Sequence, residues 1–97
     1  MVTISVFGKE NCARCKTTKN KLNHFISSWR LDHEVKIVFH DMETLDGRAE
    51  GAFYDVNQIP ATIVQKDGRS IARWDGEVPN SDSVKQSLEL EPNAASH

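Results

Sequence analysis

The first 41 residues alternate between a β-branched segment, a helical pattern and a second β-branched segment. VTISVF (2–7) is apolar at most positions, which is typical of a strand that is covered on both faces. After Gly8, apolar residues recur near the helical period as far as Trp29, and EVKIVFHD (34–41) then predicts a second strand. A strand, a crossover helix and another strand in so short a stretch predict a parallel pair with a right-handed connection. This unit restricts the chain to folds of the α/β class.

The rest of the chain predicts a second helix, a β-hairpin and a closing helix. The second helix has a set of apolar residues that we expect to face the core: Leu45, Ala49, Ala52, Phe53 and Val56. ATIVQ and RSIARW flank the turn KDG at 66–68, a pattern typical of a hairpin. NSDSVKQSLEL predicts a final helix capped at position 80 or 81, with Val84 and Leu88 as its apolar contacts.

These elements follow the order βαβαββα within a single domain of residues 1–90. A length of 97 residues suits one hydrophobic core. The hairpin adds antiparallel strands beside the first strand, so we expect a mixed four-stranded sheet with helices on both faces. The last residues, 91–97, are expected to form a flexible C-terminal tail.

Composition argues against several classes of partner. The chain has no apolar run near the roughly 18 residues that a membrane span needs, and its N-terminus, MVTISVF, is too short and too polar for a secretory signal. Its 14 acidic residues exceed the 12 Lys and Arg, and no basic stripe with interleaved aromatic residues suggests nucleic-acid binding. We therefore expect a cytoplasmic monomer with no membrane or nucleic-acid partner.

The only cysteines, Cys12 and Cys15, lie in the segment KENCARCKTTK (9–19). A CxxC pair can be a redox pair, half of a zinc site or two buried thiols. Structural zinc needs four ligands, and the chain offers no second cysteine pair and only scattered histidines, so we expect no metal site within the chain. The buried-thiol interpretation suits Cys15 better than Cys12.

The position of Cys12 favours a reactive thiol. We expect Asn11 to cap the helix and Cys12 to lie in its first turn, where unpaired N–H groups and the helix dipole stabilise an anion. Nearby cations add positive potential that is opposed only by Glu10: Lys9, Arg14, Lys16 and Lys19. Such surroundings lower a thiol pKa below its usual value of about 8.5 and supply thiolate near neutral pH. Cys15 lies one helical turn later, within reach of Cys12 for a disulfide.

Over nearly all of residues 2–90 the chain resembles the thioredoxin/glutaredoxin superfamily. CARC (12–15) follows a strand and opens a helix, as the active site of that family does. IPAT (59–62) resembles the segment that carries the family's cis-proline, and KDGRSIARWDG (66–76) resembles its terminal hairpin and the following glycine. The resemblance implies the thioredoxin fold with strand order 2-1-3-4, and a cis Pro60 that faces the CARC loop.

The resemblance also implies a function, a thiol-disulfide oxidoreductase acting on protein disulfides. Cys12 would attack the substrate and Cys15 would resolve the mixed disulfide. The backbone of Ile59 would pair with an extended substrate segment, and the expected substrate contacts are Ile59, Pro60, Gly76, Arg14 and Trp74. Electrons would come from an external reductase or a thiol donor, because the chain has no nucleotide fingerprint such as GxGxxG and implies no bound cofactor.

Two alternatives on the same fold stay open. One is a glutaredoxin-like carrier in which two chains bridge an iron–sulfur cluster through Cys12; the other is a redox-inactive interaction module. The sequence also departs from the family pattern. Val6 stands where the thioredoxin branch has a buried carboxylate, and WDGEVPNSD (74–82) matches only in part the stretch by which glutaredoxins hold glutathione.

Overall fold

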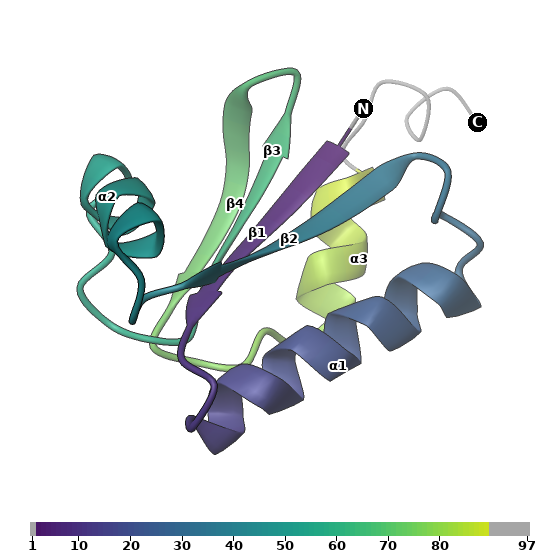
Figure 1. Ribbon diagram of the computed structural model, residues 1–97. Coiled ribbons are helices and arrows are strands. Elements are labelled where there is room, and N and C mark those ends of the chain that lie inside the picture. Colours follow the sequence, from purple (N-terminus) through teal and green to yellow (C-terminus); the bar gives the residue numbers. More distant parts are fainter. Residues whose placement is uncertain (1, 90–97) are drawn as a thin grey trace.

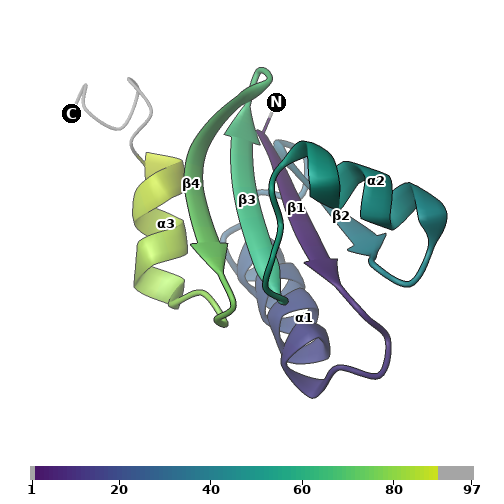
Figure 2. The same ribbon diagram turned by 90° about the vertical axis from the view of Figure 1, so that its left-hand side faces the viewer.

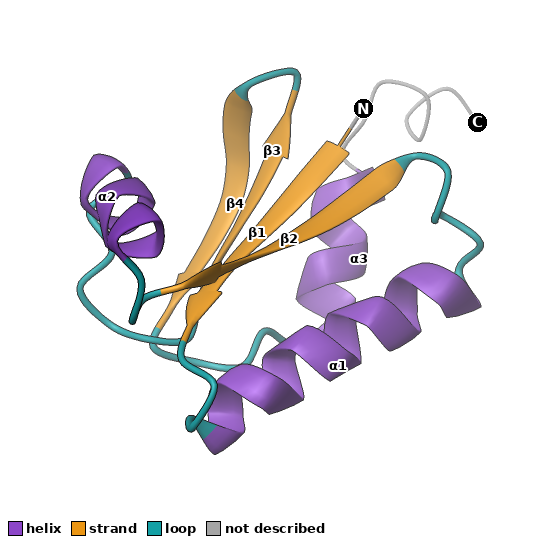
Figure 3. Cartoon of the chain, viewed as in Figure 1, coloured by secondary structure: helices purple, strands orange, loops and turns teal. Residues whose placement is uncertain are grey.

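The computed structural model describes residues 2–89, so the predicted tail lies outside the described residues. The elements in chain order are β1 Val2–Gly8, α1 Ala13–Ser28, β2 Val35–Asp41, α2 Leu45–Phe53, β3 Ala61–Lys66, β4 Arg69–Asp75 and α3 Ser81–Glu89. The predicted order βαβαββα is confirmed (Figures 1 and 3). Within the described part of the chain, every helix falls short of the length and apolar character needed to cross a membrane.

The sheet has four strands in the predicted order β2-β1-β3-β4. The central strand β1 runs parallel to β2 and antiparallel to β3, and β3 forms a hairpin with β4. The turn of this hairpin places Asp67 at φ 51° and Gly68 at φ 84°. Two positive φ values in a row favour the Asp-Gly pair, because these residues tolerate the left-handed region. The chain is therefore an α/β protein with a mixed sheet, as predicted.

Helices α1 and α3 cover one face of the sheet, and α2 covers the other (Figures 1 and 2). Side chains alternate along β1, so that Ile4 and Val6 belong to one core cluster and Phe7 to the other. The cluster beneath α1 and α3 consists of Ile4, Val6, Leu22, Ile26, Val35, Val64 and Val84. The smaller cluster, on the α2 side, consists of Phe7, Ala61 and Ile63. A sheet buried on both faces explains why β1 is apolar at consecutive positions.

The predicted core face is wrong for the residues within α2, although Val56, which follows the helix, packs against the smaller core cluster. Leu45 is 76% exposed and Phe53 is 78% exposed, whereas the buried residues of the helix are Gly47 and Gly51. A Cβ at Gly47 would clash with the backbone carbonyl of Asp41, the last residue of β2, so the helix approaches the end of β2 too closely for a side chain. Helix α2 therefore packs through its glycines, and its larger apolar side chains point to solvent.

The closing helix agrees with its prediction. The Oδ1 atom of Asn80 accepts hydrogen bonds from the N–H groups of Asp82 at 2.8 Å and Ser83 at 3.3 Å, which is the geometry of a helix cap. Val84 is fully buried and Leu88 packs against the same core cluster. This helix closes the core beside β4 (Figure 2).

His40, near the end of β2, packs flat on Phe7 with 4.5 Å between the ring centroids. Its burial lowers the pKa of the imidazole below 6.5, although the charge of Glu50 acts in the opposite direction. A folded pKa below the unfolded value means that the unfolded chain takes up a proton first as the pH falls. The neutral ring therefore contributes stability that is present above about pH 6.5 and is lost as the pH falls below it.

We expect His40→Phe to weaken the pH dependence of folding stability, because phenylalanine stacks on Phe7 without titrating. The measurement is the free energy of unfolding from urea titrations of both proteins at about pH 7.5 and about pH 5.5. The wild type should lose more stability than the variant between these two values. Equal losses would show that His40 does not titrate differently in the folded and unfolded chains.

Candidate active site

Cys12 is the N-cap of α1, the position predicted for Asn11. Its backbone is extended, with φ −101° and ψ 113°, and its Sγ accepts a hydrogen bond from the N–H of Cys15 at 3.1 Å. The first helical bond runs from the N–H of Lys16 to the carbonyl of Cys12 at 3.1 Å. The sulfur thus occupies the place that a serine or aspartate oxygen usually takes at a helix start. An acceptor in this position faces the positive end of the helix dipole, which favours a thiolate over a thiol.

Cys15 lies in the first turn of α1, three residues after Cys12. It is fully buried, whereas Cys12 is half-buried. The two residues form a disulfide, and their Cα atoms are 5.2 Å apart, within the usual range for a bridged pair. Cys15 packs directly against Gly8, where an added Cβ would lie 2.6 Å from Sγ and 2.7 Å from Cβ of Cys15. The glycine at the end of β1 therefore makes room for the inner sulfur.

Pro60 and Gly76 meet the CARC loop through a chain of hydrogen bonds. The Ile59–Pro60 peptide bond is cis, as the family resemblance implies, and Pro60 is buried. The Pro60 carbonyl accepts a hydrogen bond from the N–H of Gly76 at 2.8 Å. The Gly76 carbonyl in turn accepts one from Nη2 of Arg14 at 2.5 Å. Three segments that are far apart in the sequence are thereby joined at one end of the sheet.

Arg73 holds the loop that leads from α2 to Pro60, a contact that sequence reasoning missed. Its Nη1 donates to the carbonyl of Tyr54 at 2.6 Å and its Nη2 to the carbonyl of Asp55 at 3.1 Å. Its Nε forms an ion pair with Asp75 at 2.9 Å. The alternation along β4 places Arg73 on the face opposite Trp74, but an irregular loop with Asp55 at φ 55° gives no sequence signal for a partner.

The remaining predicted residues lie at different places around the dithiol. Ile59 is half-buried beside Pro60, and Trp74 packs against the core cluster beneath α1 and α3. Lys9 and Lys16 are exposed near the start of α1. The roles predicted for these side chains in substrate binding and in lowering the pKa of Cys12 stay predictions.

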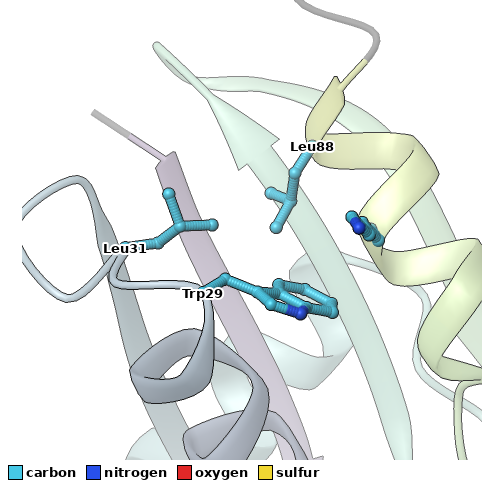
Figure 4. A pocket seen from close by; sticks show the side chains of 4 residues that line it. Trp29, Leu31 and Leu88 are labelled. Carbon is cyan, nitrogen blue, oxygen red and sulfur yellow. The ribbon is translucent and has the colours of Figure 1, made fainter.

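Two hollows lie at opposite ends of α1. One, of about 220 Å³, adjoins the dithiol loop and is lined by Lys9, Glu10, Lys16, Lys19 and Phe39. The other, of about 370 Å³, is lined by Trp29, Leu31, Lys85 and Leu88 (Figure 4). Trp29 is the C-cap of α1, so this second hollow lies far from Cys12. Among residues 2–89, no cluster of three or more His, Cys, Asp or Glu side chains is arranged to hold a metal ion.

Different accessibility should give the two thiols different reactivity. We expect iodoacetamide at about pH 6.5 to alkylate reduced Cys12 at least about tenfold faster than Cys15, since only Cys12 is open to solvent at a helix start. Trypsin cleavage after Arg14 separates the two cysteines, so peptide masses report each rate independently. Equal rates at both sulfurs would contradict the assignment of Cys12 as the attacking thiol.

Solved structures of thioredoxins are similar to this fold over nearly the whole chain. Thioredoxin-2, described as a component of the malaria parasite protein secretion machinery, superimposes with a TM-score of 0.78 at 14% identity, covering 94% of this chain and 84% of that chain. Mitochondrial thioredoxin 3 of Saccharomyces cerevisiae has a TM-score of 0.71 at 19% identity, covering 93% and 78% respectively. Thioredoxin of Fasciola hepatica has a TM-score of 0.71 at 19% identity, covering 92% and 79%.

No family model matches the sequence, and a search of curated proteins finds no match. At such low identity the structural likeness shows the fold alone. The chain has the thioredoxin fold, with CARC as a CxxC pair at disulfide distance.

Proposed function

We propose that this thioredoxin-fold protein is a thiol-disulfide oxidoreductase that reduces or exchanges protein disulfides through Cys12 and Cys15. The observation that carries the proposal is the pairing of an accessible sulfur at the start of α1 with a fully buried sulfur one turn later. In a two-thiol mechanism, an accessible thiol attacks the substrate and a second, shielded thiol resolves the mixed disulfide. The structural neighbours, which are thioredoxins, support the same class of reaction.

The reaction begins when the Cys12 thiolate attacks one sulfur of a substrate disulfide. The substrate S–S bond breaks, its electron pair leaves on the second substrate sulfur, which takes up a proton, and Cys12 is left in a mixed disulfide. Cys15 then loses its proton and attacks Sγ of Cys12. The mixed disulfide breaks, the first substrate sulfur leaves as a thiol, and the protein has donated two electrons in forming its own disulfide. An external dithiol or a reductase returns these electrons.

The start of α1 lowers the energy of the first step. The N–H of Cys15 points at Sγ of Cys12, so a negative charge on this sulfur receives a hydrogen bond without rearrangement. The same contact stabilises Cys12 as the leaving group during re-reduction, when the second thiol of an external dithiol attacks its own sulfur bonded to Cys12 and displaces Cys12. The attack on the substrate and the final release of Cys12 therefore both benefit from one feature of the backbone.

The loop around Pro60 supplies the second half of the proposed site. Hydrogen bonds from Gly76 and Arg14 link the Pro60 carbonyl to the CARC loop, and Arg73 fixes the residues before it. The backbone of Ile59 would then present a fixed edge to an extended substrate segment, as in other cases of strand addition. A disulfide in a mobile or extended segment fits this arrangement better than one buried in a folded core.

Reduction of insulin by dithiothreitol tests the proposal. The full chain should shorten the delay before insulin turbidity appears, in proportion to protein concentration, because it turns over as a catalyst. A delay equal to that of dithiothreitol alone would contradict the proposed function.

A further inference from the structure

The hollow beside the dithiol is basic. Three of its lining residues are Lys9, Lys16 and Lys19, and the other two are Glu10 and Phe39. The Lys19 ammonium lies 4.9 Å from the centre of the Phe39 ring, so the aromatic face forms an apolar wall beside a cation. Cys12 contacts a lining residue of this hollow, since its N–H donates to the carbonyl of Lys9 at 3.3 Å.

The segment around this hollow is positively charged, whereas the net charge of the whole chain is negative. Residues 9–19 contain four basic residues and one acidic residue, although the chain as a whole has a net charge of −2. Within residues 2–89, no carboxylate forms an ion pair with Lys9, Lys16 or Lys19. The acidic residue of β2, Asp41, accepts a hydrogen bond at its Oδ1 from the N–H of Glu43 at 2.9 Å. The hollow therefore keeps a net positive charge, with three lysines and a single carboxylate, Glu10, in its lining.

The hollow on the opposite side of the site, at the β4 edge, lacks this excess of positive charge. A polar hollow of about 220 Å³ at the β4 edge is lined by Asp55, Asn57, Gln58, Arg73 and Asp75, and its only cation, Arg73, is already bound to Asp75. The strands β2 and β4 are the two edges of the sheet (Figure 2). Between them lie β1, which leads into the dithiol loop, and β3, which follows Pro60. A substrate crossing the site therefore meets three lysines on the β2 side, whereas on the other side Arg73 is paired with Asp75 and Arg14 is bound to the Gly76 carbonyl.

We infer that the hollow formed by Lys9, Lys16, Lys19 and Phe39 selects disulfide substrates that carry acidic side chains near the reacting cysteine. The inference rests on the proposed function and names its substrate class. Lys19 follows Cys12 by seven residues, or about 10 Å along a helix. An extended segment covers that distance in about three residues. Carboxylates two or three residues from the substrate cysteine would reach the ammonium groups while its sulfur meets Cys12.

Three matched peptides test this selectivity. Each contains one cysteine, linked as a mixed disulfide to the neutral leaving group 2-thiopyridine, with Glu, Gln or Lys placed two and three residues to either side. Attack by Cys12 on the peptide sulfur releases 2-thiopyridone, whose absorbance gives the rate with pre-reduced protein. We expect the Glu peptide to react about fivefold faster than the Gln peptide at low salt, and the Lys peptide to react slowest. Salt at about 0.5 M should remove most of this preference.

Lys19→Glu and Lys36→Glu provide a matched pair of variants with the same net charge. Lys36 is exposed and pairs in register with Thr3, at the end of β1 remote from the dithiol. We expect Lys19→Glu to abolish the preference for the Glu peptide and Lys36→Glu to retain it. The ratio of rates for two peptides on one protein is the quantity compared, because any change in the Cys12 thiolate affects both peptides equally.

The outcomes distinguish a failure of the proposed substrate class from a failure of the proposed oxidoreductase function. Equal rates for the three peptides, or the same loss of preference in both variants, would overturn the substrate class and leave the oxidoreductase proposal intact. Failure of pre-reduced protein to react with any peptide would overturn the proposed function, and this inference with it.

Discussion

Replacing Cys12 with serine should lower the rate of insulin reduction by at least about a thousandfold. Cys12 is the sulfur that lies half-buried at the start of α1, while Cys15 is fully buried and packed against Gly8. A serine hydroxyl at this position stays protonated near neutral pH and makes no stable bond to sulfur. The protein should still fold, because a serine oxygen can accept the hydrogen bond from Cys15 that closes the helix cap.

Cys15→Ser is the matched control, and it should fail in a different way. Cys12 can still attack, but the mixed disulfide loses its intramolecular exit, so the variant should accumulate as a covalent adduct with the insulin chain. Non-reducing electrophoresis followed by mass spectrometry identifies the bridged cysteine. More adduct with Cys12→Ser than with Cys15→Ser would reverse the roles of the two thiols.

Gly8→Ala should destabilise the protein by about 1–3 kcal/mol, the usual cost of adding atoms to a packed interior. The new methyl group would lie 2.6 Å from Sγ of Cys15, and that sulfur cannot rotate away while it is bonded to Cys12. Either the end of β1 or the start of α1 must move. We therefore expect lower stability in urea unfolding and faster alkylation of Cys15 in the reduced protein.

Gly68→Ala separates the local effect from a general loss of stability. Gly68 lies in the hairpin turn at φ 84°, with no atom within 4 Å of an added Cβ, so its substitution costs only backbone strain of roughly 1–2 kcal/mol. It should leave the alkylation rates of both cysteines unchanged. A Gly8→Ala protein with wild-type stability and wild-type alkylation rates would contradict the close packing of Cys15 on β1.

Strong local patterns made most of the fold predictable. β1 and β2 are dense in β-branched residues, Asp67 and Gly68 suit the hairpin turn, and Asn80 has the side chain of a helix cap. Each of these signals comes from neighbouring residues and needs no knowledge of distant contacts. The cysteine pair was predictable for the same reason, because a CxxC spacing on a helix brings two sulfurs together locally.

The errors concern features that depend on distant parts of the chain. Leu45 and Phe53 had the spacing of a core face, but α2 approaches the end of β2 through Gly47 and Gly51, and glycines carry no hydrophobic signal. Position 11 was predicted as the helix cap from residue type alone, since a sulfur cap is rare. The anchoring of the loop before Pro60 by Arg73 joins residues about twenty positions apart, which periodicity cannot detect.

The central claim is that Cys12 and Cys15 form a reversible redox pair. The most direct measurement is an anaerobic titration of the protein in glutathione and dithiothreitol buffers of stepped potential, with acid quenching, alkylation of free thiols and mass analysis. The account predicts one two-electron transition in which both thiols disappear together, with a midpoint between about −270 and −120 mV; a value below about −250 mV would indicate a reductant, and one near −120 mV an oxidant. Thiols that stay unpaired across this whole range, or that form only separate adducts with glutathione, would contradict it.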